Sequence, residues 1–185
     1  MSTVQYSVAY VERHSRITTL FRGLLALPHA IVSSIWSIGA SICSLFQWWV
    51  IMFTGKRSEG LWSVQKNWLG YAARVQSYST YMFDKWPAFG AESDGEPVTY
   101  SFDFEAKASR LRTFFQPLIA IPAVLVMIFM GIGFVFCAFV CFWAILFTGK
   151  QPRGLFDFML KFHRFMVNFV AFNLYMTDAS PKWGA

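Results

Sequence analysis

The sequence predicts an all-α integral membrane protein built from two tandem repeats, and three observations lead to this prediction. Hydrophobic residues make up 56% of the 185 residues. Charged residues make up only 14%, well below the roughly 25% that is usual in soluble domains. No formally charged residue occurs from Leu24 to Phe53 or from Leu118 to Phe147, and the tetrapeptide FTGK closes both of these apolar runs.

The two halves of the chain align without a gap when residue n is paired with residue n + 94. About 27 of roughly 86 aligned positions are then identical, from Tyr6 and Tyr100 to Asp84 and Asp178, which chance does not produce. We therefore expect a first membrane repeat unit at 1–91, a linker at 92–99 and a second membrane repeat unit at 100–185.

Each repeat begins with a short segment in which apolar residues partly alternate with polar ones. These segments are YSVAYVE at 6–12 and VTYSFDFEAK at 98–107. Alternation with a period of two is typical of an extended strand.

A long apolar run follows in each repeat, at 17–53 and 111–147. A straight helix of this length would measure roughly 55 Å, more than the bilayer core of about 30 Å. The run either kinks near its proline, Pro28 or Pro122, and crosses once, or folds back near Gly39 as a hairpin. Basic residues at both ends of each run favour the hairpin, with both FTGK segments cytoplasmic. We expect a multi-pass protein of the bacterial inner membrane.

The two FTGK segments, at 53–56 and 147–150, are interpreted as helix ends. A phosphate-binding loop needs a second glycine five residues before the Gly-Lys pair, and neither segment has one. Glycine instead supplies the left-handed residue that ends a helix, and lysine interacts with its free carbonyl groups.

A second helix follows each FTGK segment and is predicted to be amphipathic. Apolar residues recur every three or four positions from Leu61 to Met82 and from Leu155 to Met176. The opposite face carries polar residues such as Arg74 in the first unit and Lys161, Arg164 and Asn168 in the second. We expect both helices to lie in the headgroup plane of the membrane.

Basic residues flank the apolar runs and give the chain a net charge of +6. We expect them to contact anionic lipid headgroups rather than nucleic acid, since no separate basic face with stacking aromatics is present. The candidate headgroup ligands are Arg16, Lys56, Arg57, Arg110, Lys150 and Arg153.

Small residues inside the first run recur at every fourth position and indicate close helix packing. They are Ser33, Ser37 and Ser41, with Gly39 between them and Gly133 at the matching place in the second unit. Because the second unit replaces the serines with larger residues, we expect the tighter packing in the first unit.

No group of residues in the sequence predicts catalysis or metal binding, so we expect a protein that is not an enzyme. No nucleophile stands with a base and an orienting group. His29, near the start of the first run, is a candidate contact for a haem or chlorophyll, although a lone histidine more often makes hydrogen bonds. His163 is expected to be solvated beside Arg164. Bound lipids are the only ligands that we expect.

The segments SRLRTFFQPLIAIPAVLV at 109–126 and FWAILFTGKQPRGLF at 142–156, with their first-unit equivalents, are similar to a bacterial membrane family. It is domain-of-unknown-function family 4389. The first unit keeps Arg16, Pro28 and His29, but has Ser58 where the second has Pro152. The resemblance covers nearly the whole chain and implies a tandem pair of membrane domains. Because the family has no established activity, the resemblance implies no site.

Three functional hypotheses follow. The first is a non-enzymatic accessory or scaffold subunit that binds other integral membrane subunits of a larger complex. The second is a lipid-binding or lipid-organising protein that acts through interfacial helices and basic headgroup clamps. The third is a subunit that contacts a pigment or haem through His29. A transporter is not expected, because no ionisable residue lies deep in either run.

Overall fold

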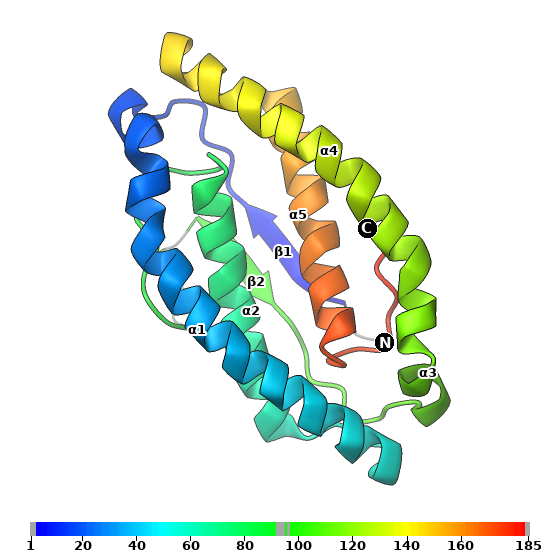
Figure 1. Cartoon of the computed structure of the whole chain (residues 1–185). Helices are drawn as coiled ribbons and strands as arrows, with labels where there is room; N and C mark the ends of the chain where they lie inside the picture. The colour runs from blue at the N-terminus through cyan, green and yellow to red at the C-terminus, as the bar shows by residue number, and fades with distance from the viewer. Residues whose placement is uncertain (1–2, 92–94, 96, 184–185) are drawn as a thin grey trace.

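The computed structural model describes residues 3–91, 95 and 97–183. Its elements in chain order are β1 (Gln5–Val8), α1 (Arg16–Thr54), α2 (Glu59–Ser79), β2 (Val98–Ser101), α3 (Arg110–Phe114), α4 (Gln116–Thr148) and α5 (Arg153–Asn173). The long helices α1 and α4 form two flanks that run in opposite directions (Figure 1). Helices α2 and α5 pack between the flanks, and the two strands lie behind them (Figure 1). The fold is therefore mostly helical, with a small sheet.

The first apolar run forms one continuous long helix, and the second forms a short helix followed by one long helix, so the hairpin expected from the sequence is wrong. Helix α1 has 39 residues and contains Pro28, and α4 has 33 residues and contains Pro122. The glycines Gly39 and Gly133 lie within these helices rather than at a turn. Both helices are long and apolar enough to cross a membrane. The second run differs from the first only at its start, where Phe115 separates the short α3 from α4.

The ends of the long helices follow from local chemistry, as the sequence predicts. The side chain of Ser15 accepts a hydrogen bond from the backbone N–H of Thr18 and caps the start of α1. At the other end Gly55 has φ 73°, and its counterpart Gly149 after α4 has φ 71°. The FTGK segments are thus left-handed glycine helix ends.

The two segments expected to be extended are strands, and they pair with each other. Strands β1 and β2 are antiparallel, with Tyr6 opposite Tyr100 and Val8 opposite Val98. Tyr6 and Tyr100 occupy equivalent positions in the two units. An antiparallel pair centred on equivalent residues lies on a pseudo-two-fold axis that relates the units.

Reciprocal backbone hydrogen bonds confirm this pseudo-two-fold relation between the units. The N–H of His14 donates to Gly149 O at 3.0 Å, and the N–H of Ala108 donates to Gly55 O at 3.1 Å. Each FTGK segment therefore contacts the segment that precedes the long helix of the other unit. The two units interlock rather than pack as separate domains.

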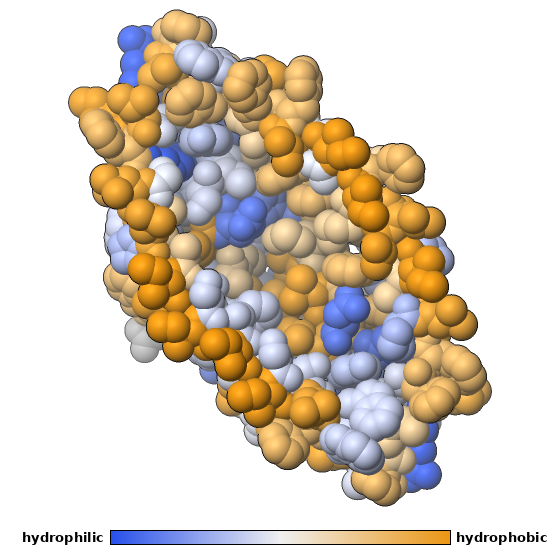
Figure 2. All heavy atoms as spheres, in the orientation of Figure 1, coloured by the Kyte–Doolittle hydropathy of each residue, from blue (hydrophilic) through white to orange (hydrophobic). Residues whose placement is uncertain are grey.

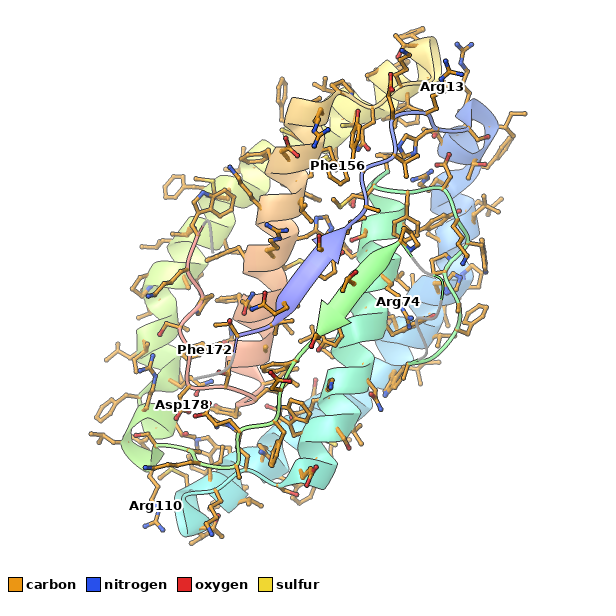
Figure 3. All side chains as sticks on the ribbon, turned by 180° about the vertical axis from the view of Figure 1, so that it is seen from behind. Arg13, Arg74, Arg110, Phe156, Phe172 and Asp178 are labelled. Carbon is orange, nitrogen blue, oxygen red and sulfur yellow. The ribbon has the colours of Figure 1, made fainter. Side chains whose placement is uncertain are left out.

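The amphipathic helices α2 and α5 lie in the interior and not with their polar faces toward the headgroups, which corrects the prediction. Strand β2 covers the polar face of α2, where the ring of Tyr100 lies against Gly70. Strand β1 covers α5, because Asn168 accepts from the N–H of Val4 at 2.9 Å and Arg164 Nε donates to Tyr6 O at 2.8 Å. Figure 3 shows the strands across these two helices.

The expected linker at 92–99 overlaps the sheet, since β2 begins at Val98. Residues 92–94 and 96 lie outside the described part of the chain. The first two residues of β2 thus fall within the expected linker, and the bounds of the two units stay a prediction.

Candidate membrane-binding surface

The outer faces of the flanking helices are apolar along their whole length. Exposed side chains recur every seven or eight residues on each helix, and together they form what we call the apolar stripes. The α1 stripe contains Ile17, Leu24, Ile31, Ile38, Leu45 and Phe53, and the equivalent α4 stripe, with its start in α3, contains Leu111, Leu118, Leu125, Ile132, Phe139 and Phe147. Figure 2 shows these hydrophobic ridges over α1 and α4 on one face, with a more polar hollow between them.

The inner face of α1 is the more polar one. Its buried residues include Thr19, Arg22, His29, Ser44 and Gln47. Only 11% of the most apolar stretch of α1, and the same share in α4, is buried inside the protein. A core helix of a soluble protein buries its apolar face, so this inverted arrangement is typical of helices that contact lipid.

Basic residues stand at both ends of the stripes. Arg110 Nη2 donates to Phe53 O at 2.8 Å, so its guanidinium lies at the C-terminal end of α1. Arg16 is equivalent and approaches Gly149 at the end of α4. In Figure 3, Arg13 and Arg110 mark the two opposite ends of the molecule.

Four of the six candidate headgroup ligands lie at the surface, where their charged groups can reach a lipid headgroup. Arg16, Lys56, Arg110 and Arg153 are exposed, and the guanidinium of Arg153 also lies over the ring of Tyr10. The fifth, Lys150, is exposed but pairs with Glu12 at 2.9 Å. Exposed pairs of this kind contribute little to stability, so Lys150 can exchange its partner.

Arg57, the sixth candidate, is buried and cannot reach a headgroup. Its Nη2 pairs with the carboxylate of Asp178, and its Nε donates to Tyr175 O at 2.9 Å. Its Nη1 donates to the carbonyl oxygens of Glu105 and Lys107. All of these acceptors belong to the second unit, so Arg57 joins the units.

The equivalent carboxylate in the first unit, Asp84, has a cation from its own unit. It pairs with the buried Arg22, accepts from the N–H of Ser15 at 2.6 Å, and lies 2.9 Å from His14 Nδ1. Partial burial opposes ionisation of Asp84, but the hydrogen bonds from His14 and Ser15 and the charges of His14 and Arg22 outweigh it. The pKa of Asp84 is therefore lowered.

The two carboxylate sites draw on the same pair of equivalent positions, but arginine occupies a different one of them in each site. Position 22 is Arg in the first unit and its equivalent, 116, is Gln in the second; position 57 is Arg and its equivalent, 151, is Gln. Each site thus contains one arginine. Sequence reasoning missed these buried pairs, although the exchange of Arg for Gln at the 94-residue offset was a visible signal.

His29 is enclosed by aromatic residues. It is fully buried, its Nδ1 lies 2.8 Å from the Tyr71 hydroxyl, and its ring contacts Trp86 and Phe89 with centroids at 4.7 and 4.1 Å. The Phe89 ring stacks on His29, and the Trp86 ring is tilted against it. This arrangement gives no support to a pigment or haem contact.

His163 is also buried, which overturns the expectation that it is solvated. Its Nδ1 donates to Met159 O at 2.8 Å and its Nε2 lies 3.3 Å from the Thr80 hydroxyl. Burial disfavours the charged imidazolium and lowers the pKa of His163 to about 4. His163 is therefore neutral at pH 7 and joins α5 to the end of α2.

The small residues expected to pack tightly lie differently in the two units. Ser33 and Ser37 line an open groove of about 340 Å³ between α1 and α2. Ser41 is exposed, and a Cβ on Gly39 would meet nothing within 4 Å. A Cβ on Gly133 would lie 3.2 Å from Phe158. Gly133 thus has a close side-chain neighbour on α5 that Gly39 lacks on α2. The expectation of tighter helix packing in the first unit stays a prediction.

Comparison with known proteins identifies the family. The family described as "Domain of unknown function (DUF4389)" matches twice, at residues 16–90 and 110–184. The chain belongs to the DUF4389 family. No curated protein and no solved structure matches the chain. Each DUF4389 match contains one long helix, one FTGK segment, one interior helix and one of the buried carboxylates, while both strands lie outside the matches.

Proposed function

We propose that this protein is a monotopic membrane protein that lies along one leaflet and organises its anionic lipids, without being an enzyme. In this arrangement α1 and α4 are submerged lengthwise, and the sheet faces water. The position of the sheet at the pseudo-two-fold axis is the observation that carries the proposal.

A crossing arrangement would place unfavourable groups at the centre of the bilayer. Because α1 and α4 are antiparallel and related by the axis, crossing would put the sheet midway between the two headgroup layers. Arg164 bonds to Tyr6 at this axis, and the exposed Lys161 lies one helical turn away. Each such cation costs about 3 kcal/mol or more at the bilayer centre.

The outward face of the sheet is polar as well. Gln5, Ser7, Thr99 and Ser101 are exposed, whereas the alternate residues point inward. A half-exposed sheet of this kind is stable against water and unfavourable in hydrocarbon. The sheet therefore favours an arrangement in which its outer face is wet.

A flat arrangement places each surface in a suitable solvent. The ridges over α1 and α4 share one face (Figure 2), so both stripes can enter the same leaflet. The exposed Arg16, Lys56, Arg110 and Lys150 at the two ends then lie at headgroup depth, where each contributes about 1 kcal/mol with anionic lipid. In this arrangement both FTGK segments lie at the same leaflet of the membrane. We propose that it is the cytoplasmic leaflet of the bacterial inner membrane.

Depth measurements along α1 test this proposal. Spin labels are placed one at a time at Leu24, Ile31, Ile38 and Leu45 of cysteine-free protein in vesicles. A helix in the membrane plane gives one depth for all four labels. A depth that varies along the four positions, deepest between the ends, would refute the proposal.

The contribution of anionic lipid is tested with the equivalent residues Arg16 and Arg110. Changing both to glutamate should weaken binding to anionic vesicles at least tenfold, because four units of charge change at the headgroup layer. Binding to phosphatidylcholine vesicles should stay the same. The paired change Lys85→Glu and Lys161→Glu lowers the net charge by the same four units at exposed positions away from the stripe ends. It is the control for net charge and should weaken binding less.

A second candidate function is the accessory subunit of a membrane complex. The open groove lined by Ser33, Ser37 and Trp68 favours it, because small residues allow a partner helix to approach closely. Gentle native extraction followed by mass spectrometry tests this candidate. A co-purifying membrane protein that is lost on Ser37→Leu would support it, and recovery of the chain alone would count against it.

A further inference from the structure

A cavity of about 760 Å³ lies beside β1, at the outer side of the second unit. Helix α3 contributes Arg112, α5 contributes Arg164 and Asn168, and the C-terminal segment contributes Ser180 and Lys182. Figure 3 shows this C-terminal segment returning along α5 after Asp178. The cavity is separate from the apolar stripes.

The cavity wall is strongly basic. Arg112, Arg164 and Lys182 line it, and no carboxylate does among the described residues. No described acidic residue forms an ion pair with any of the three cations. The cavity therefore concentrates positive charge that the surrounding chain leaves uncompensated.

The two guanidinium groups are held in place and keep donors available. Arg112 Nη2 bonds to the Ser180 hydroxyl at 2.6 Å, while its Nε is buried with no partner in the described chain. Arg164 uses Nε for Tyr6 O, and Asn168 Nδ2 donates to Arg164 O at 3.0 Å. The buried Nε of Arg112 is a charged donor without an acceptor among the described residues, which is costly and is the observation that points to an anionic partner.

The first unit has no equivalent of this basic wall. The positions that match Arg164, Arg112 and Lys182 are Gly70, Thr18 and Ala88. At Gly70 the ring of Tyr100 occupies the space, since a Cβ there would lie 2.9 Å from Tyr100 Cδ1. The two units share their fold but not this cavity, so the fold alone does not require the three cations.

We propose that this cavity is a binding site for a phosphoryl group, carried either by a small phosphate ester or by a lipid headgroup. Two guanidinium groups offer paired N–H donors that match phosphate oxygens, and Lys182 adds a point charge from the C-terminal segment. The Ser180 hydroxyl adds a neutral donor beside Arg112. Three cations suit a ligand with a double negative charge better than a monocarboxylate.

Gln5, Ser7 and Thr99, on the outer face of the sheet, also line the cavity, so in the flat arrangement the cavity opens toward water. A free phosphate ester is then the ligand that agrees with the proposed function, whereas a lipid headgroup in the cavity would require the sheet face to meet a membrane.

Calorimetric titration of the full chain in zwitterionic detergent, with glycerol phosphate as the probe, tests the site. We expect saturable binding that weakens about tenfold or more in Lys182→Gln and in Arg112→Gln, since each change removes a charged donor. The matched control is Lys161→Gln, which removes an exposed charge from α5 outside the cavity and should leave binding unchanged. Lys182 is exposed, so its replacement does not disturb folding.

A second arm identifies the source of the phosphoryl group. Phosphatidylcholine vesicles containing phosphatidic acid are sedimented with each variant, with and without glycerol phosphate. Loss of vesicle binding in Lys182→Gln without saturable binding of free glycerol phosphate identifies a lipid headgroup; binding of the free ester identifies a soluble ligand. The proposal is overturned if neither probe depends on Lys182 and Arg112, or if Lys161→Gln weakens binding equally. Vesicle binding that depends only on Arg16 and Arg110 would retain the membrane function and reject this site.

Discussion

At the residue scale, the two units carry equivalent carboxylates, Asp84 partly buried and Asp178 buried, and each is paired with a buried arginine. Asp84 is neutralised by Arg22 from its own unit, whereas Asp178 is neutralised by Arg57 from the other unit. A carboxylate that is removed from water needs a paired cation. At each carboxylate the cation can come from position 22 or its second-unit equivalent, 116, or from position 57 or its second-unit equivalent, 151. The chain places arginine at a different one of these positions in each site.

Replacing Arg57 with glutamine should destabilise the protein by about 3 kcal/mol or more, because the Asp178 carboxylate loses its buried partner. The double variant Arg57→Gln, Gln116→Arg should recover at least half of this loss. The arginine introduced at position 116 would occupy the place next to Asp178 that Arg22 occupies next to Asp84. Gln116 already donates to Phe172 O, which is equivalent to the Tyr78 O that Arg22 contacts. Denaturant unfolding in detergent measures both variants. A double variant that is less stable than Arg57→Gln would contradict the exchange.

The buried His163 should make stability depend on pH. Its pKa is about 4 in the folded protein and 6.5 as the ordinary value, so the unfolded chain binds the proton first as the pH falls. The free energy of unfolding should therefore fall by about 3 kcal/mol between pH 6.5 and pH 4. Asp84 adds its loss only below its ordinary pKa of 3.8. Thermal unfolding of His163→Gln should show a smaller slope in this window, and an unchanged slope would exclude His163 as the cause.

At the scale of elements, the long helices could be placed from sequence but their inner faces could not. The absence of charge from Leu24 to Phe53 predicts a helix in contact with lipid, whether or not it turns back. The inner face of α1 mixes apolar residues with a few polar ones such as Thr19, Ser44 and Gln47. An average hydropathy over the whole run does not show on which side of the helix these polar residues lie. The hairpin is expected from the sequence because basic residues at both ends of each run favour placing both ends on the same side of the membrane. In the structure α2 packs against the inner face of α1, so α1 has a partner along its length without folding back on itself.

The close contact between β2 and α2, where Tyr100 lies against Gly70, can be tested by substitution. Alanine at Gly70 improves helix propensity by about 1 kcal/mol, but its Cβ would lie 2.9 Å from the ring of Tyr100. We expect Gly70→Ala to be destabilising by about 1 to 2 kcal/mol overall, because the ring must move. The control is Gly39→Ala, whose Cβ meets nothing within 4 Å and which should be neutral or stabilising. Equal effects of the two variants in denaturant unfolding would argue against this close contact.

At the scale of the whole molecule, the two units resemble the subunits of a two-fold symmetric dimer joined in one chain. They share a sheet, exchange backbone hydrogen bonds at both FTGK segments, and exchange one buried ion pair. Contacts between two-fold related subunits repeat in both directions. Each unit alone would expose an unpaired strand and a buried carboxylate or arginine.

Separating the chain after Ala91 should therefore give two halves that depend on each other. Co-expressed halves should purify as a one-to-one complex in mild detergent, because the contacts that join them do not use the linker. Either half alone should aggregate or pair with itself. Size-exclusion chromatography with light scattering measures the composition. Two halves that each remain folded and monomeric would show that the units are independent domains.

The sequence by itself determined the duplication, the two long apolar helices, their glycine ends and the extended segments, because each depends on residues close together in the chain. The tertiary structure decided the sheet between the units, the burial of Arg57 and His163, and the basic cavity of the second unit. Those features join residues from opposite halves. A duplicated sequence presents the same chemistry twice, so only the packed structure shows which copy supplies the partner.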